Sequence, residues 1–212
     1  MTEVKREANE GKDLLKKVAD EEYFRFPVST HLIHIKEDDE WNTPIAKRFF
    51  QNEAVVLIEF GYRDRGIIIR KGNPLNIASL QDFKRRRIAK RQDNAASQII
   101  LNTMLKDLRL QPDILFTGQK VARSEDDLAR TVKSGQAEAG FGLRAVAETH
   151  GLDFIPLMTE RLDMLIWRKF WFEPQFQKLW SFLQDVEFHE HAQITTGYNL
   201  AEMGTVLFNG TT

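Results

Sequence analysis

Cysteine is absent from the 212-residue sequence, which excludes disulfide bonds, thiolate metal sites and cysteine nucleophiles. Long apolar runs are absent too: Ala54–Ile58 is among the longest, far short of the roughly 20 residues that a membrane-spanning helix needs. Neither sign of charge dominates, because the formal net charge is −1, so the overall charge does not draw the chain to nucleic acid or to an anionic membrane. With 42% apolar and 29% charged residues, the composition is typical of a soluble globular protein.

The first residues also lack the apolar segment of a secretory signal, since MTEVKREANEGKDLLKK is charged throughout. We therefore expect a cytoplasmic protein. Residues 1–24 are predicted to be a charged N-terminal segment, helical over 2–22. Its thin apolar stripe (Leu14, Leu15 and Val18) suits a flexible lead-in or an oligomer contact better than a core element.

Residues 86–157 alternate between short strands and helices. Strands are predicted at 87–90, 114–117 and 137–140, and helices at 95–108, 124–134 and 143–149. Such alternation is typical of α/β proteins with a mainly parallel sheet.

Apolar, β-branched segments bracket this alternating block. Strands are predicted at 54–60 and 66–70, on either side of the polar residues 62–65, and again at 153–157 and 161–167. A lobe inserted into another lobe through two crossover strands would produce this order. We therefore predict lobe 1 from residues 25–85 and 158–212 and lobe 2 from 86–157, with a ligand between them at the carboxyl ends of strands. Further helices are predicted from residue 43 and at 79–83, 173–189 and 200–203, and a further strand at 30–35.

One glycine-containing stretch fits a dinucleotide-binding turn. Gly140, Gly142 and Ala145 have the G-x-G-x-x-A spacing, and Glu160 lies twenty residues beyond the first glycine. That fingerprint needs a buried strand before its first glycine, whereas residues 134–139 (SGQAEA) are half polar. We therefore favour a tight strand-to-helix turn whose amide groups face a cleft, with NAD binding as the weaker alternative.

The same stretch resembles a known family. Residues 133–142 (KSGQAEAGFG), followed by GLDFIPL at 151–157 and by Glu160, are similar to the type II periplasmic-binding-protein-like effector domain of molybdate-type transcriptional regulators. Other matching pieces occur in that family's order: His31-Leu32, Asn42-x-Pro44, Arg63-x-x-Gly66, Gly72-Asn73-Pro74, Leu80-x-Asp82, Arg91-Gln92 and Gly197-Tyr198. The resemblance covers about residues 25–207. It implies a two-lobed fold, cytoplasmic sensing of a small ligand such as the oxyanions molybdate or tungstate, and no catalysis.

The sequence departs from this family in two places. Where the family has a Gly-Ser-Gly-Thr-Arg-like helix entry, this chain has DNAASQ at 93–98, so Ala95 and Gln98 replace a hydroxyl and a guanidinium, and Asp93 adds negative charge. Amide groups at this helix start, with the hydroxyl of Ser97, can still hold an anion. The strand and helix that begin such lobes look shortened or absent, so we expect a shortened first lobe, whose exposed strand a partner chain or residues 2–22 would cover.

The resemblance and the predicted helix starts together select candidate ligand-binding residues. These are Asn42, Thr43 and Arg63 in the first lobe, Asn94, Ala95, Ala96, Ser97, Ser124, Glu125, Gly140, Phe141 and Gly142 in the second, and Tyr198 as a wall of the site. Most would contribute backbone amides at helix N-termini. Arg63 is the expected charge partner of an anion, because a guanidinium presents a planar fork to oxygen atoms, unless it pairs with Asp64 or another neighbour.

Other polar and aromatic features have simpler explanations. His31 is a candidate ligand contact, although a partly buried histidine with its hydrogen bonds satisfied is the favoured interpretation. His189-x-His191 has no carboxylates suitably spaced nearby, so no metal site is predicted. The basic run at 84–91 is expected to be a solvated helix end entering a strand rather than a nucleic-acid contact. The aromatic residues of 170–180 include Trp171 and Phe172, which could form an exposed patch for a partner.

Catalytic signatures are missing: neither a nucleophile elbow nor a P-loop nor a His-Glu-x-x-His spacing is present. The sequence therefore predicts a non-enzymatic small-ligand-binding sensor domain, without a cofactor, that forms a homo-oligomer. The alternative is an interaction protein that kept the fold and lost its ligand, which the altered helix entry and the shortened lobe both favour. An enzyme would require an unrecognised carboxylate pair in the cleft.

Overall fold

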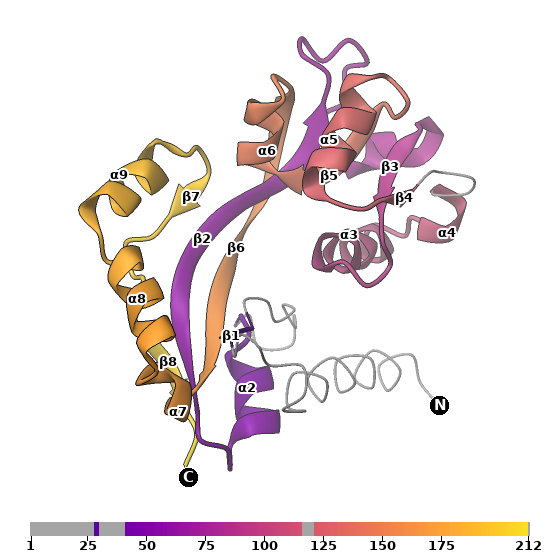
Figure 1. The fold of residues 1–212 in the computed structure, drawn as a ribbon. Coiled ribbons are helices and arrows are strands. Elements are labelled where there is room, and N and C mark those ends of the chain that lie inside the picture. The colour runs from indigo at the N-terminus through magenta and orange to yellow at the C-terminus, as the bar shows by residue number, and fades with distance from the viewer. Residues whose placement is uncertain (1–27, 30–40, 116–120, 212) are drawn as a thin grey trace, which may run out of the picture.

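Two long antiparallel strands run through the molecule (Figure 1). The computed structural model describes residues 28–29, 41–115 and 121–211. Strand β2 (Val55–Ile69) and strand β6 (Asp153–Trp167) each contain 15 residues and pair along their whole length. The polar residues 62–65, expected to separate two strands, instead continue β2, because they are paired with residues 158–161 of β6.

The remaining strands extend this pair into a mixed sheet with the order β1-β6-β2-β5-β3-β4, in which β7 and β8 also pair with β2. These strands are β1 (Val28–Ser29), β3 (Ile88–Arg91), β4 (Val121–Ala122), β5 (Ala139–Leu143), β7 (Tyr198–Asn199) and β8 (Val206–Asn209). The α/β class and the two crossover strands are confirmed. The mainly parallel sheet is wrong: of the described strand pairs, only β3–β4 and β3–β5 are parallel, because β6 and β5 both run opposite to β2.

Helices gather around the two ends of the β2–β6 pair, which gives the molecule two lobes (Figure 1). One lobe contains η2 (Leu80–Arg85), α3 (Ala96–Asp107), α4 (Pro112–Leu115), α5 (Glu125–Lys133) and α6 (Arg144–Thr149). The other contains α2 (Thr43–Phe50), α7 (Arg168–Trp171) and α8 (Pro174–Leu183), and α9 (Val186–Ile194) continues from α8. The residue boundaries of the lobes given above stay a prediction.

Consecutive residues of the crossing strands supply cores on opposite faces of the sheet, because side chains alternate along a strand. Ile67 and Ile69 belong to the core that includes α3, whereas Ile68 belongs to the core that includes α5 and α6. In the other lobe, Leu165 packs with α2, and its neighbours Met164 and Ile166 pack with α8. The same alternation determines which polar side chains of β2 and β6 lie on one face and can meet.

Two helix starts agree with their capping signals, whereas the side chain of Asn42 makes no capping hydrogen bond at the start of α2. The hydroxyl of Ser124 accepts the amide hydrogen of Asp127 and begins α5, and Ser79 and Asp82 form a capping box that begins η2. The predicted helix at 173–189 is instead two helices, because the carboxylate of Asp185 caps the start of α9. No helix in the described part of the chain is long and apolar enough to span a membrane.

Several smaller predictions are wrong or fall outside the described residues. Residues 112–115 form α4, so the strand expected at 114–117 is wrong where the structure describes it. Residues 201–204 form a turn, so the helix expected at 200–203 is wrong. The predicted helix of residues 2–22, the strand at 30–35, His31 and the shortened first lobe lie outside the described residues.

Candidate functional site

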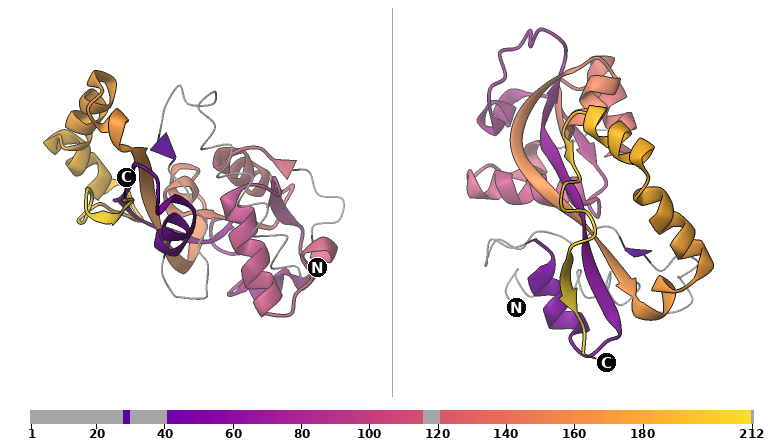
Figure 2. Two further views of the ribbon diagram at one scale, coloured as in Figure 1. Left: turned by 90° about the horizontal axis from the view of Figure 1, so that it is seen from below. Right: turned by 90° about the vertical axis from the view of Figure 1, so that its left-hand side faces the viewer.

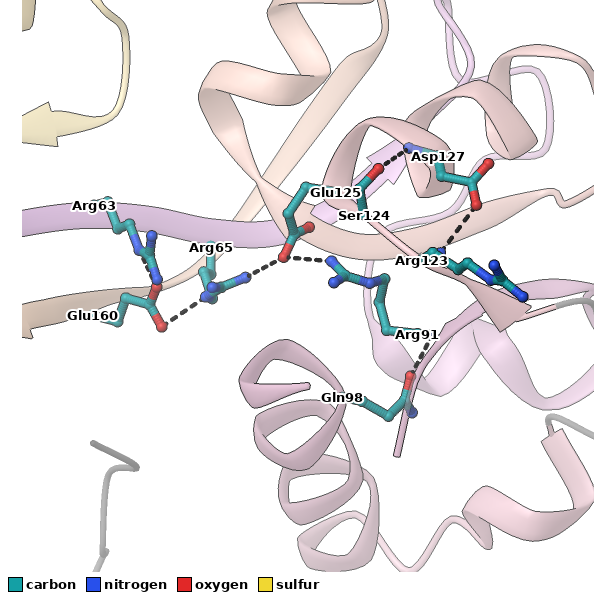
Figure 3. A network of polar contacts seen from close by, with 9 residues as sticks. All are labelled: Arg63, Arg65, Arg91, Gln98, Arg123, Ser124, Glu125, Asp127 and Glu160. Atoms are coloured by element: carbon teal, nitrogen blue, oxygen red, sulfur yellow. Dashed lines mark hydrogen bonds and ion pairs between the residues drawn. The ribbon is translucent and has the colours of Figure 1, made fainter. Parts of the chain in front are cut away.

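Three arginines and two glutamates form a chain of ion pairs where β2, β6, β3 and α5 meet (Figure 3). Glu160 pairs with Arg63 through one carboxylate oxygen and with Nε of Arg65 through the other, at 2.6 Å. Oε1 of Glu125 lies 3.3 Å from a terminal nitrogen of Arg65 and 3.1 Å from one of Arg91. We call these five residues the arginine cluster.

Strand register and one helix cap position this cluster. Arg63 lies directly opposite Glu160 in the β2–β6 ladder, and Arg65 projects from the same face of β2 two residues later. Ser124 caps α5, so Glu125 is the first residue of that helix. Gly142 makes room for the carboxylate, because a Cβ atom there would lie 2.8 Å from Oε2 of Glu125.

The arginine cluster is largely buried and carries an excess of positive charge. The side chains of Glu160 and Arg65 are 0% and 3% exposed, so neither is screened by bulk water. Burial alone would lower the pKa of Arg65, but the neighbouring carboxylates of Glu160 and Glu125 outweigh it and raise that pKa, so Arg65 stays charged. Three guanidinium groups against two carboxylates leave one net positive charge.

Two helix N-termini adjoin the cluster. Gln98, in the first turn of α3, accepts the backbone amide hydrogen of Arg91 at 2.8 Å (Figure 3). The N-cap residue of α3 is Ala95, whose side chain makes no capping hydrogen bond, and α5 begins at Glu125 itself. The first turns of both helices direct amide groups and the positive ends of their dipoles toward their starts, which favours an anion there.

The structure brings together only some of the predicted residues. Ser124 and Glu125 are at the cluster. Asn94 and Ala95 lead into α3 beside it, and Ala96 and Ser97 are the first two residues of that helix. Tyr198 of β7 lies opposite Arg63 in the β2–β7 ladder.

The glycine pair is not where it was predicted. Gly140, Phe141 and Gly142 lie inside β5, in register with β2, rather than in a strand-to-helix turn. Gly140 allows α5 to approach the sheet, because a Cβ atom there would lie 2.6 Å from the side chain of Leu128. Phe141 is 1% exposed and belongs to the hydrophobic core around α3. These glycines therefore serve the packing of α5 and of Glu125 against β5.

Asn42 and Thr43 lie in a second polar cluster, with Glu59, Arg161 and Asp163, which we call the acidic cluster. Asn42 donates to a carboxylate oxygen of Asp163 at 2.7 Å, and Arg161 contacts Asp163 at 2.9 Å and the hydroxyl of Thr43 at 3.2 Å. Arg161 directly follows Glu160 in β6, so its side chain points to the opposite face of the strand. Asn42 and Thr43 are thus separated from Arg63.

Buried carboxylates distinguish the acidic cluster. Glu59 is 5% and Asp163 2% exposed. Burial raises the pKa of Glu59, and the opposing attraction of Arg161 only partly offsets it. Burial likewise raises the pKa of Asp163, against the hydrogen bonds from Arg161 and Asn42. Among the described residues, no group of three or more His, Asp or Glu side chains is placed to hold a metal ion.

Sequence reasoning missed Arg65, Arg91 and Glu160 as members of one site. The available signal was the Arg63-x-Arg65 repeat inside an apolar, β-branched stretch, since residues two apart share one face of a strand.

The basic run at 84–91 forms ion pairs within the molecule: Arg86 pairs with Glu138, Lys90 with Asp93 and Arg91 with Glu125. The Lys90–Asp93 pair, at 2.7 Å, also offsets the negative charge of Asp93 near α3.

An open cavity of about 590 Å³ lies next to the start of α5, at the carboxyl ends of β3 and β4. Gln92, Val121, Arg123 and Asp127 line it, and none of the predicted site residues does. The side chain of Arg123 turns away from the arginine cluster (Figure 3). The cavity therefore adjoins the cluster without containing it.

Comparisons with known proteins agree with this architecture. Among solved structures, the regulatory domain of Synechocystis PCC6803 CcmR in complex with 2-PG matches with a TM-score of 0.55 at 7% identity, covering 82% of this chain and 77% of that one. The substrate-binding domain of a putative molybdenum ABC transporter from Clostridium difficile matches with a TM-score of 0.54 at 12% identity, covering 91% and 83%. At these identities the likeness shows the fold alone.

Sequence comparison identifies the family. The uncharacterized protein YvgK of Bacillus subtilis (strain 168) is 34% identical over 145 residues, which are 67% of this chain and 46% of that protein. The chain thus spans about half the length of this curated relative. The family model described as the PBP superfamily domain matches residues 28–184, most of the chain. The chain therefore belongs to the PBP superfamily domain family, whose periplasmic-binding-protein-like fold its two lobes and crossing strands display.

Proposed function

We propose that this domain binds a small anion without transforming it, and that the arginine cluster is the binding site. The observation that carries the proposal is the excess of guanidinium groups beside the uncapped start of α3 and the first residue of α5. Guanidinium groups and helix N-termini both favour oxygen anions, and their effect is strongest where water is excluded. Membership of a family of small-ligand-binding domains supports the same function.

Glu125 occupies the position that such an anion would take. Its carboxylate lies at the start of α5 and pairs with both Arg65 and Arg91, as an incoming oxyanion would. The side chain is 21% exposed, so it has room to turn toward solvent. In this proposal a ligand displaces Glu125 and takes over its two arginine partners, and Arg63 supports the site through Glu160.

The proposed ligand is an oxyanion such as molybdate or tungstate, and the proposed role is that of an effector domain of a molybdate-type regulator in the cytoplasm. The sequence resemblance to such effector domains supports this choice. The tetrahedral anions sulfate and phosphate and small carboxylates share the chemistry that guanidinium groups recognise, so they belong in the same screen.

A thermal-shift screen of the purified chain against these anions tests the proposal. A saturable rise in the unfolding temperature is expected for at least one anion. Arg63→Ala should weaken that ligand's apparent affinity about tenfold, because it removes a cation from the cluster. Arg144→Ala is the matched control, since Arg144 is a partly exposed arginine outside the cluster whose partners are Asp64 and Glu148. Equal affinities for wild type and Arg63→Ala would contradict the assignment.

The same contacts also support a second function, in which the ion pairs are permanent. All three arginines of the cluster already have a carboxylate partner, so the site could be a permanent ion-pair network in an interaction protein that no longer binds a ligand. This alternative predicts that no anion raises the unfolding temperature and that the chain forms a stable oligomer.

A further inference from the structure

The end of α7, the outer side of α8 and the start of α9 present apolar side chains to solvent. Phe172, Phe182 and Val186 are 80%, 58% and 69% exposed, and Leu179 is 41% exposed. Leu179 and Phe182 are three residues apart and therefore share one side of α8. The ring of Phe182 packs on that of Phe188 with centroids 5.2 Å apart, which joins this surface to α9. We call Phe172, Leu179, Phe182 and Val186 the α8–α9 face.

The fold itself does not need this face. The inner side of α8 already packs on the crossing strands through Phe176 and Leu183, which are 6% and 5% exposed. Trp171 and Trp180 complete that contact, with ring centroids 5.0 Å apart. The two helices run along the outside of the molecule (Figure 2). Large apolar side chains gathered on such an outer surface are typical of a protein–protein contact.

We propose that the α8–α9 face is the contact between two copies of this chain, docked with their α8 helices antiparallel about a two-fold axis near Phe182. A two-fold contact requires a self-complementary surface, because the same residues meet from both sides. An aromatic side chain at the axis would meet its own copy, and such central aromatic residues contribute most of the binding energy in many interfaces.

The charges that flank the face are complementary in this arrangement. Lys169 and Lys178 lie on its α7–α8 half with one carboxylate, that of Glu173, whereas three carboxylates, those of Asp185, Glu187 and Glu190, lie on its α9 half, and all six side chains are exposed. Antiparallel docking places the lysines of one copy near the carboxylates of the other. A parallel arrangement would place like charges together, which is unfavourable. This distribution of both signs along one face favours a second copy over a partner of a single charge.

The proposal is independent of the anion site, because none of its residues belongs to the arginine cluster. It goes beyond the ligand-binding function and can fail while that function stands. Anion binding should therefore be measured on the same variants, and a variant that loses the dimer is expected to keep its thermal shift.

Light scattering of the 212-residue chain over a concentration series tests the interface. The wild type is expected to have twice the monomer mass of 24.6 kDa. Phe182→Glu should raise the dimer dissociation constant at least about 100-fold, because it places two carboxylates at the axis. Val206→Glu is the matched control, since Val206 is 59% exposed on β8, and it should leave the mass unchanged. Circular dichroism would verify that the variants are folded.

A charge exchange tests the orientation. Lys178→Glu should weaken the dimer roughly tenfold, and adding Glu187→Lys to the same chain should restore it. A wild type that is monomeric at about 100 µM would overturn the proposal, since even weak specific dimers form there. A dimer that survives Phe182→Glu would overturn it as well.

Discussion

The two polar clusters beside the crossing strands both combine guanidinium groups with carboxylates and yet differ in charge balance. In the arginine cluster, three guanidinium groups surround two carboxylates, and these carboxylates raise the pKa of Arg65 despite its burial, so that Arg65 stays charged. In the acidic cluster, one guanidinium, that of Arg161, faces two buried carboxylates whose pKa values are raised. The consecutive residues Glu160 and Arg161 divide the clusters, because they project from opposite faces of β6.

This difference shows how a single strand can serve two purposes. A buried excess of positive charge favours an incoming anion, whereas a buried excess of carboxylate favours an incoming proton. Asn42 and Thr43, expected to bind ligand beside Arg63, instead hold Asp163 and Arg161 in place. We therefore propose ligand binding for the arginine cluster and a structural, pH-dependent role for the acidic cluster.

The largest effect is expected from Arg65→Met. This change leaves Glu160 fully buried with one ion-pair partner fewer, and breaking a buried ion pair typically costs 3–5 kcal/mol, so we expect a loss of about 3 kcal/mol in the free energy of unfolding. Urea denaturation measures it. Arg144→Met is the control: its side chain is 40% exposed, and it should cost less than about 1 kcal/mol. Equal losses in the two variants would contradict the buried network.

A smaller effect, on binding, is expected from Glu125→Gln. The glutamine keeps the size of the side chain and removes the charge that competes for Arg65 and Arg91, so affinity for the anion should rise about tenfold, equivalent to about 1.4 kcal/mol. Asp126→Asn is the matched control, because it removes the neighbouring charge of the same helix turn, and its partner is His150. If both variants change the affinity equally in isothermal titration calorimetry, the effect reflects overall charge and Glu125 is not a competitor.

The smallest effect is expected in the acidic cluster. Burial raises the pKa of Glu59 in the folded state above its ordinary value of 4.5. At pH values between the unfolded and the folded pKa, the folded state therefore binds more protons than the unfolded state. The contribution of Glu59 to the free energy of unfolding is therefore fully present below its unfolded pKa and is lost as the pH rises through its folded pKa.

Glu59→Gln removes this loss, so it should stabilise the protein by about 1 kcal/mol at pH 7.5 and by less at pH 4.5, as measured by urea denaturation at both pH values. The exposed Glu53→Gln should show no such difference between the two pH values. A stabilisation by Glu59→Gln that is the same at both pH values would contradict the raised pKa.

Local signals predicted much of the fold. Capping residues such as Ser79 and Ser124 located helix starts, and the two β-branched stretches identified the crossing strands. Polar residues 62–65 looked like a connection because their partners in β6 lie nearly a hundred positions away, beyond any local pattern. The helix expected through residue 185 failed because the cap of α9 interrupts the apolar periodicity without glycine or proline.

The site was harder to predict than the fold, for the same physical reason. Whether Asn42 meets Arg63 depends on which face of β2 and β6 each side chain occupies, and the irregular pairing between Glu59 and Gly61 shifts that relation. Resemblance located the elements that carry the site. It could not show that Glu125 and Glu160 would pair with the arginines.

The proposal that the arginine cluster binds an anion is best tested by a nuclear magnetic resonance titration of the isotope-labelled chain with molybdate. We expect saturable shifts confined to the side-chain Nε–H groups of Arg63, Arg65 and Arg91 and to backbone amides at the starts of α3 and α5. Sulfate would serve as the second anion. Saturable shifts that leave these groups unmoved, or no saturable shift with either anion, would contradict it.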